Sequence, residues 1–210
     1  MKTQKGFTLV EIAIVLVIIG LLLGGVLKGK EIITNARVKN LENSVDGLAA
    51  AIYSYQDRYQ SSPGDDAYVG RFVGLSNDAS GNGGDGDGNI VGDFADFNKS
   101  KETSRLWLHL RNAGLVAGSI DKTKDESYKQ PLNAFSGVIG AGTNPADTNG
   151  TNISTVTIPD LFVGFTKIPN DIAIILETRA DDGITNSGGL QSDQTDYTDK
   201  NALHELFFDI

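Results

Sequence analysis

The sequence predicts an α+β protein in which a long N-terminal helix is followed by a head of short strands and long loops. Residues 7–27 are almost entirely apolar, and apolar residues then recur at helical spacing as far as Tyr59. Beyond Pro63, short β-like segments alternate with stretches rich in Gly, Asn, Asp, Ser and Thr, which are typical of loops. A helix followed by several short strands is the pattern of an α+β domain.

The first apolar segment, residues 7–27, has Glu11 as its only ionisable side chain. At 1.5 Å per residue it is about 31 Å long, which matches a hydrocarbon core of about 30 Å. It can therefore cross a bilayer once. Because Lys2 and Lys5 precede it, we expect a cytoplasmic N-terminus. A secretory signal peptide begins in a similar way, but GGVLKGK at its end offers no convincing small-residue cleavage site.

The helix is predicted to continue beyond the apolar segment. Apolar residues follow one another in alternating steps of three and four, at Val38, Leu41, Val45, Leu48, Ile52, Tyr55 and Tyr59. This spacing gives a helix one apolar stripe. The stripe covers barely three heptads, so we expect it to pack on the chain's own head rather than form a free coiled coil. Ser61-Ser62-Pro63-Gly64 is predicted to end the helix.

The head is predicted to contain one short helix and several strands. Residues 101–118 indicate a helix with Leu106, Trp107 and Leu110 facing inward and Gly114 at its C-terminal end. β-like segments are predicted at residues 136–140, 153–158 and 161–167. Residues 172–177 fit either a strand or a helix, because a short apolar run does not distinguish the two.

Composition excludes several classes of function. The chain has 27 acidic and 18 basic residues, a formal net charge of -9, which argues against a nucleic-acid partner. It has no cysteine, so disulfides and thiolate metal sites are impossible. His109 and His204 are the only histidines, and neither has a recognisable catalytic partner in the sequence. The sequence therefore does not predict an enzyme.

The segment Gly6-Phe7-Thr8-Leu9-Val10-Glu11, between a short basic leader and the apolar helix, resembles the N-terminus of type IV pilins and type II secretion pseudopilins. The resemblance implies that prepilin peptidase cleaves between Gly6 and Phe7 and methylates the new amine of Phe7. It also implies that Glu11 pairs with this amine on a neighbouring subunit. Two charges that are costly alone in an apolar core become tolerable as a pair, and the pair fixes one register.

The resemblance implies a pilin-like fold, with the helix packed on a small antiparallel-sheet head. The resemblance divides the chain into a leader at 1–6, a transmembrane and filament-core helix at 7–27, an amphipathic continuation of the helix at 28–61 and a periplasmic or extracellular head at 62–210. The expected partners are copies of itself or other pilins, prepilin peptidase, an assembly platform and membrane lipid. The implied location is the bacterial inner membrane before assembly, and the sequence does not separate a pilus subunit from a pseudopilus subunit.

Two differences from common pilins make the chain more similar to the major pseudopilins within this family. Lys28 stands where pilins often have a proline, and no disulfide can close the C-terminal region. Major pseudopilins also lack that disulfide and use calcium instead, which makes calcium a candidate cofactor. Two acidic groups are the candidate ligands: Asp85, Asp87, Asn89 and Asp93 in GNGGDGDGNIVGDFAD, and Asp181, Asp182, Asp193 and Asp196 near the C-terminus. Solvated acidic loops are the alternative interpretation of both.

A second function class remains open from the sequence. The apolar helix could serve as a single-pass tether for a periplasmic binding module or enzyme. Retention of residues 1–6 in the mature protein would favour this alternative, whereas a chain beginning at a methylated Phe7 would favour the filament subunit.

Overall fold

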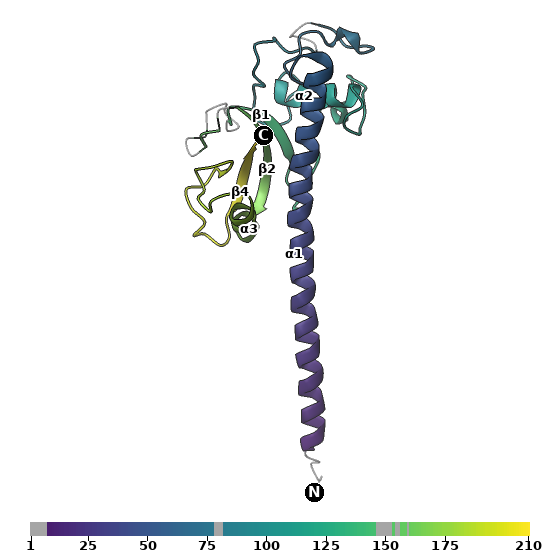
Figure 1. Ribbon diagram of the computed structural model, residues 1–210. Coiled ribbons are helices and arrows are strands. Elements are labelled where there is room, and N and C mark those ends of the chain that lie inside the picture. The colour runs from purple at the N-terminus through teal and green to yellow at the C-terminus, as the bar shows by residue number, and fades with distance from the viewer. Residues whose placement is uncertain (1–7, 78–81, 146–152, 154–155, 159) are drawn as a thin grey trace. The chain divides into compact units, whose positions relative to one another are not determined.

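The computed structural model describes residues 8–77, 82–145, 153, 156–158 and 160–210. The chain divides into two compact units, with the boundary between Lys39 and Asn40. Helix α1 runs from Leu9 to Tyr59, and its residues up to Lys39 belong to the first unit (Figure 1). The predicted continuous helix is therefore confirmed.

The C-terminal part of α1 contributes an apolar stripe to the second unit. Leu41, Ile52 and Tyr55 are fully buried, and Val45, Leu48 and Ala51 are nearly so. The helix ends where the backbone of Gln60 takes a φ of 54°, just before Ser61-Ser62-Pro63-Gly64. The heptad spacing from Leu41 onward thus predicted the buried face correctly, and the stripe packs within the head as expected.

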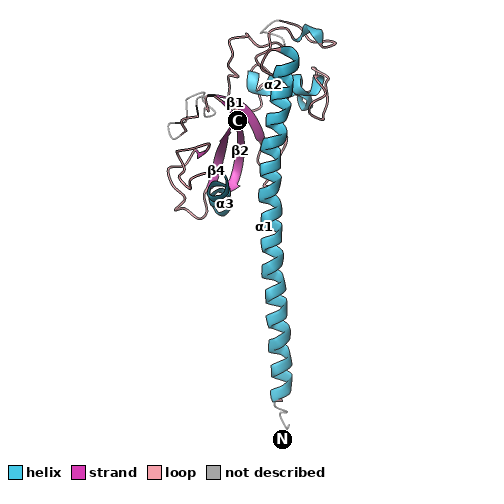
Figure 2. Ribbon diagram, in the orientation of Figure 1, coloured by secondary structure: helices cyan, strands magenta, loops and turns pink. Residues whose placement is uncertain are grey.

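The head contains a four-stranded antiparallel sheet. Its strands are β1 (Ile139–Thr143), β2 (Leu161–Pro169), β3 (Leu190–Ser192) and β4 (Leu203–Asp209). Their order is β1-β2-β4-β3, so the last strand in the sequence lies between β2 and the short edge strand β3. Much of the remaining head is loop (Figure 2).

Two helices flank this sheet. Helix α2 (Glu102–Asn112) contacts β1, and helix α3 (Asn170–Ala180) follows β2 directly and contacts β2, β3 and β4 (Figure 1). Leu106, Trp107 and Leu110 of α2 are buried, as predicted. The backbone of Gly114 just after α2 has a φ of 71°, which suits a glycine at a helix end. Short 3₁₀ turns lie at Val69–Arg71 and Asp125–Ser127.

Three phenylalanines form a core cluster against the sheet. The rings of Phe94, Phe162 and Phe207 meet edge to face, with centroids 5.3 to 5.7 Å apart. Gly140 and Gly164 are paired across β1 and β2, and Phe94 covers both. A Cβ atom on Gly164 would lie 2.6 Å from Cε2 of the Phe94 ring, so the paired glycines leave the space that this ring fills.

The strand predictions were only partly correct. The predicted strand at 161–167 matches β2, and the one at 136–140 overlaps β1 but begins three residues too early. The ambiguous segment 172–177 is helical. The prediction of a strand at 153–158 is wrong for Ile153 and residues 156–158, which lie outside any strand, while 154–155 are outside the described residues. Strands β3 and β4 were not predicted.

Candidate functional site

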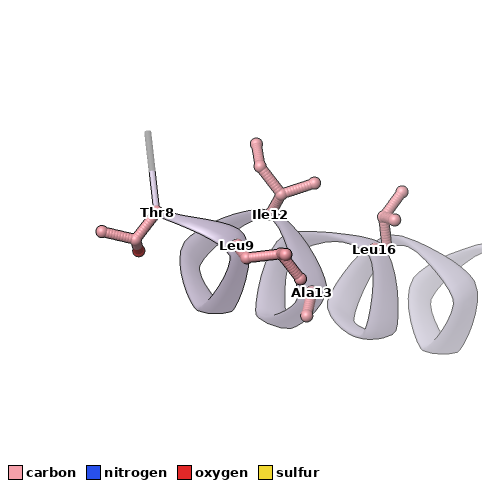
Figure 3. Close-up of a pocket in the computed structure, with 5 residues that line it drawn as sticks. All are labelled: Thr8, Leu9, Ile12, Ala13 and Leu16. Carbon is pink, nitrogen blue, oxygen red and sulfur yellow. The ribbon is translucent and has the colours of Figure 1, made fainter. Parts of the chain in front are cut away.

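The N-terminal part of α1 presents apolar side chains on all sides. Leu9 is 87% exposed and Leu21 is 73% exposed, and none of the most apolar 18-residue window is buried. The window is long and apolar enough to cross a membrane. Figure 3 shows a shallow groove on the first turns, where Leu9, Ile12, Ala13 and Leu16 project beside Thr8. Such a surface requires lipid or other apolar helices around it.

Glu11 lies within this apolar surface and forms hydrogen bonds with Thr8. The Thr8 main-chain N–H and hydroxyl each donate to Glu11 Oε2 at 2.8 Å, and the Glu11 N–H donates to the Thr8 hydroxyl at 3.3 Å. These reciprocal bonds form a capping box at the start of α1. The sequence pattern Thr-x-x-Glu is a signature of this capping box, although the capping box was not among the predictions. Gly6 and Phe7, the predicted cleavage and methylation positions, lie outside the described residues.

The first predicted calcium loop is organised around two carboxylates that sequence reasoning missed. Asp65 accepts hydrogen bonds from the N–H groups of Gly86 (2.6 Å) and Gly88 (2.8 Å). Glu102 accepts from the N–H groups of Asp85 (3.3 Å) and Val91 (2.9 Å). One carboxylate oxygen each from Asp65, Asp85 and Glu102 lie within 4.8 Å of one another. Burial raises the pKa of both Asp65 and Glu102.

The other residues predicted as ligands in this loop are not members of the group of three carboxylates. Asp87 accepts a hydrogen bond from the N–H of Asn89 (2.8 Å), and Asp93 accepts one from Ala95 (2.8 Å). Of the four predicted ligands, only Asp85 belongs to the carboxylate group with Asp65 and Glu102. Asp65 and Glu102 are 20 and 17 residues away from Asp85 in sequence, so no local spacing could have identified them.

The second acidic group lies where α3 ends. Glu177 is the third member beside the predicted Asp181 and Asp182, again with oxygens within 4.8 Å of one another. Glu177 is fully buried, Asp181 is half-buried and Asp182 is exposed. Burial, with smaller contributions from the charges of Asp181 and Asp182, raises the pKa of Glu177 to about 8. Sequence reasoning could have found Glu177, because in a helix it shares a face with Asp181 four residues later.

The remaining predicted ligands near the C-terminus form other bonds. Asp193 Oδ1 accepts a hydrogen bond from the N–H of Glu205 (2.8 Å), and Asp196 Oδ1 accepts from both the N–H and the hydroxyl of Thr198 (2.9 and 2.6 Å). Neither belongs to a group of carboxylates close enough to share an ion among the described residues. The structure therefore brings together Asp181 and Asp182 but not Asp193 and Asp196.

Three side chains form a hydrogen-bonded chain that resembles a catalytic triad in its connectivity. Ser192 Oγ lies 2.9 Å from His204 Nδ1, and His204 Nε2 lies 2.9 Å from Asn170 Oδ1. Because Asn170 Oδ1 only accepts, Nε2 carries the ring proton and Nδ1 accepts from the serine hydroxyl. Ser192 and His204 are fully buried and Asn170 is 4% exposed. A substrate cannot reach this serine, so the chain joins β3, β4 and α3 structurally.

An open cleft of about 480 Å³ lies beside these strands. Its lining includes Thr166, Lys167, Asp193, Leu203 and Glu205. Burial raises the pKa of Glu205 to about 7, with further contributions from the charges of Asp193 and Asp93. The cleft does not include Ser192 or His204 in its lining. The buried hydrogen-bonded chain therefore does not line this cleft.

Comparison with known families identifies the N-terminal segment. Residues 1–27 match the prokaryotic N-terminal methylation motif. This is the prepilin-type motif of type IV pilins and pseudopilins, so the resemblance seen in the sequence is confirmed. The pilin-like arrangement of a long apolar helix and a four-stranded antiparallel head is confirmed by the structure. Neither a curated protein nor a solved structure matches the chain.

Proposed function

From this motif and the exposed apolar helix, we propose that the chain is a non-enzymatic subunit of a type IV pilus-like or type II secretion pseudopilus filament. Prepilin peptidase cleaves the chain between Gly6 and Phe7 and methylates the amine of Phe7. The mature subunits then polymerise through contacts between their α1 helices. The observation that carries the proposal is a prepilin-type motif at residues 1–27 that includes an apolar helix surface, and among the described residues none of the most apolar window of this helix is buried.

Assembly through α1 would exchange lipid neighbours for neighbouring helices. Lipid tails are as apolar as leucine side chains, so the gain comes from close packing and from interhelical polar contacts. Four glycines on α1, Gly20, Gly24, Gly25 and Gly29, have nothing within 4 Å of a Cβ placed on them. Small residues at such positions let helix backbones approach closely. The apolar surface therefore suits both states, first in lipid and then in the filament core.

Glu11 would set the axial position of each subunit. Within one chain its carboxylate is bonded to Thr8 in the capping box. A carboxylate has more acceptor positions than these two bonds occupy, so it can also receive the amine of a neighbour's Phe7. Only leader removal creates that amine. Cleavage and assembly are thereby coupled through one charge pair, which is favourable only when both charges are present.

The proposed cellular location of the chain follows from the same motif and from the apolar part of α1. Before assembly, α1 would cross the bacterial inner membrane once, with the N-terminus cytoplasmic and the head periplasmic. An assembly platform with its ATPase would extract the subunit, and the heads would form the outside of the filament. Calcium remains a candidate cofactor of the head.

Intact-mass measurement and a charge variant test this proposal. In a host with prepilin peptidase, the mature chain should begin at a methylated Phe7. Glu11→Gln should insert into the membrane normally but enter filaments far less than wild type. Glu31→Gln is the matched control, because Glu31 lies on the same helix, is exposed and pairs with Lys28 at 2.8 Å. Equal incorporation of the Glu11 and Glu31 variants would contradict the role of Glu11.

A membrane-tethered binding module is the second candidate, and the cleft lined by Lys167, Asp193 and Glu205 is the observation that favours it. This alternative expects the chain to stay in the membrane as a monomer. A full-length mass that includes residues 1–6, in a host that processes other prepilins, would support the tether and exclude the filament subunit.

A further inference from the structure

A surface turn just before α2 carries a sequence motif that the proposed filament function does not use. Residues 96–100 read Asp-Phe-Asn-Lys-Ser, so Asn98 is followed two residues later by Ser100. The pattern Asn-x-Ser or Asn-x-Thr, with any residue but proline at x, is the acceptor sequence of N-linked glycosylation. It occurs three times in the chain, at Asn98, Asn149 and Asn152, and the one at Asn98 lies wholly within the described residues.

We infer that Asn98 is an acceptor site for an N-linked glycan, recognised through Ser100 and Asp96. Bacterial oligosaccharyltransferases select acceptors that also have an acid two residues before the asparagine, where it can pair with a basic side chain of the enzyme. Asp96 stands at that position. The same spacing recurs in the segment Asp147-Thr148-Asn149-Gly150-Thr151, so the extended pattern is present twice in this chain.

The structure presents this acceptor sequence at the surface. Asp96, Asn98 and Ser100 are all exposed. Asn98 Oδ1 accepts the main-chain N–H of Ser100 at 3.0 Å, and the Asn98 carbonyl oxygen accepts the N–H of Lys101 at 2.9 Å. These bonds form an Asx turn within a tight turn of the main chain. The carboxamide of Asn98 is thereby held close to Ser100, so the acceptor and the residue that identifies it are presented together.

The reactive atom of Asn98 is available. Among the described residues, neither the Asn98 side-chain nitrogen nor the Asp96 carboxylate forms a hydrogen bond. Asn82 and Asn133 differ, because both are buried and each donates a hydrogen bond of 2.8 Å from its side-chain nitrogen. An enzyme can therefore approach the Asn98 amide without breaking a side-chain contact of the head.

The reaction needs one co-substrate, a lipid-linked oligosaccharide. The side-chain nitrogen of Asn98 forms a bond to the anomeric carbon of the oligosaccharide and loses one proton. The bond between that carbon and the lipid diphosphate breaks, and the diphosphate leaves with the bonding electrons. The product is a bulky, solubilising glycan on the surface of the head.

The inference rests on the proposed function in one respect, because the donor is used on the periplasmic side, where the head is proposed to lie. The test is therefore made independent of location. The purified full-length chain, in detergent, is incubated with a purified bacterial oligosaccharyltransferase and a lipid-linked oligosaccharide. Failure of this reaction would leave the filament proposal intact, and failure of leader cleavage or filament entry would leave the acceptor site intact.

Intact mass and peptide mapping measure the product. The chain carries Asn149→Gln and Asn152→Gln, which leave Asn98 as its remaining acceptor sequence. We expect a mass increase equal to the transferred oligosaccharide, located on the peptide that contains Asn98, and loss of this increase in Asn98→Gln. Asn201 is the internal control, because it is exposed but has no hydroxyl residue two positions later, and it should stay unmodified.

Two further variants test the recognition residues. Ser100→Ala should abolish the modification, whereas Ser100→Thr keeps a hydroxyl and should retain it. Asp96→Ala should be modified more slowly than the chain with Asp96. The absence of a glycan on Asn98 would overturn the inference, and so would a glycan that Asn98→Gln retains. Full modification of Ser100→Ala, or an unchanged rate in Asp96→Ala, would overturn the role assigned to that residue.

Discussion

The main-chain N–H of Gly64 donates a hydrogen bond of 2.8 Å to Nδ1 of His109, 45 residues later in the chain. Because Nδ1 accepts this bond, the ring proton is on Nε2, which donates to the carbonyl oxygen of Asn82 at 2.7 Å. The ring is fully buried and stacks on Tyr55 of α1 at 6.3 Å between centroids. His109 thus joins α2 to the end of α1 only in its neutral form.

This arrangement predicts a loss of head stability in acid. Burial lowers the pKa of His109 from 6.5 to about 4, so the unfolded chain takes up the proton at a higher pH than the folded chain does. The contribution is fully present above pH 6.5 and is lost as the pH falls toward 4. At 1.36 kcal/mol per pKa unit, it amounts to about 3 kcal/mol.

Denaturant unfolding followed by Trp107 fluorescence measures this effect, since Trp107 is the single tryptophan and is buried in α2. The raised pKa values of Glu177 and Glu205 change stability in the opposite sense, so the comparison is with His109→Gln at each pH. The stability difference between wild type and this variant should shrink from pH 7 to pH 4.5. A pH-independent difference would contradict the prediction.

The helices were predictable because their signals are local. The spacing of Leu41, Val45, Leu48 and Ile52 reports a buried helical face directly. The strands were harder to predict from the sequence. The segment containing Ile153, Val156 and Ile158 is rich in β-branched residues, as strands are, but these three residues pack against the Phe94 cluster from a loop. Such residue types favour an extended backbone, whereas a strand also needs a neighbour for its main-chain hydrogen bonds, and that neighbour is set by the tertiary fold.

The candidate sites also differ in whether their residues are close together in the sequence. Thr8 and Glu11 are three residues apart, and the motif that contains them is a contiguous sequence signal. Asp65 and Glu102 reach the Asp85 loop from distant positions in the sequence, whereas Glu177 is only four residues from Asp181 and was recognisable from helical spacing. The first carboxylate group therefore depended on long-range packing, whereas the second is local in the sequence, and calcium binding by either group stays a prediction.

Tyr55→Phe should weaken the attachment of α1 to the head. The Tyr55 hydroxyl donates to Asp66 Oδ2 at 2.6 Å in a fully buried environment. Hydrogen bonds to charged groups contribute about 1.5–3 kcal/mol, so the free energy of unfolding should fall by about that amount. Tyr53→Phe is the control, because Tyr53 is 48% exposed on the same helix. Equal stability of the two variants would show that the hydroxyl contributes nothing.

Ser192→Ala should destabilise the head. It removes the hydroxyl that donates to His204 Nδ1 and leaves a buried ring nitrogen without a partner. An unsatisfied buried acceptor costs about 1–3 kcal/mol. The control is Thr198→Ala, which removes an exposed hydroxyl bonded to Asp196 and should change stability by less than about 0.5 kcal/mol. A loss in Ser192→Ala no larger than in this control would disprove the role assigned to the buried chain.

Gly164→Ala should disrupt the aromatic cluster on the sheet. A Cβ on Gly164 would lie 2.6 Å from the Phe94 ring, which is itself held edge to face by Phe162 and Phe207. Overpacking of this kind costs about 1–3 kcal/mol, measured as the free energy of unfolding in denaturant. Gly189→Ala is the matched control, because a Cβ there meets nothing within 4 Å and should leave stability unchanged or slightly raised. If both variants were equally stable, Phe94 could move aside, and the paired glycines would not determine where its ring lies.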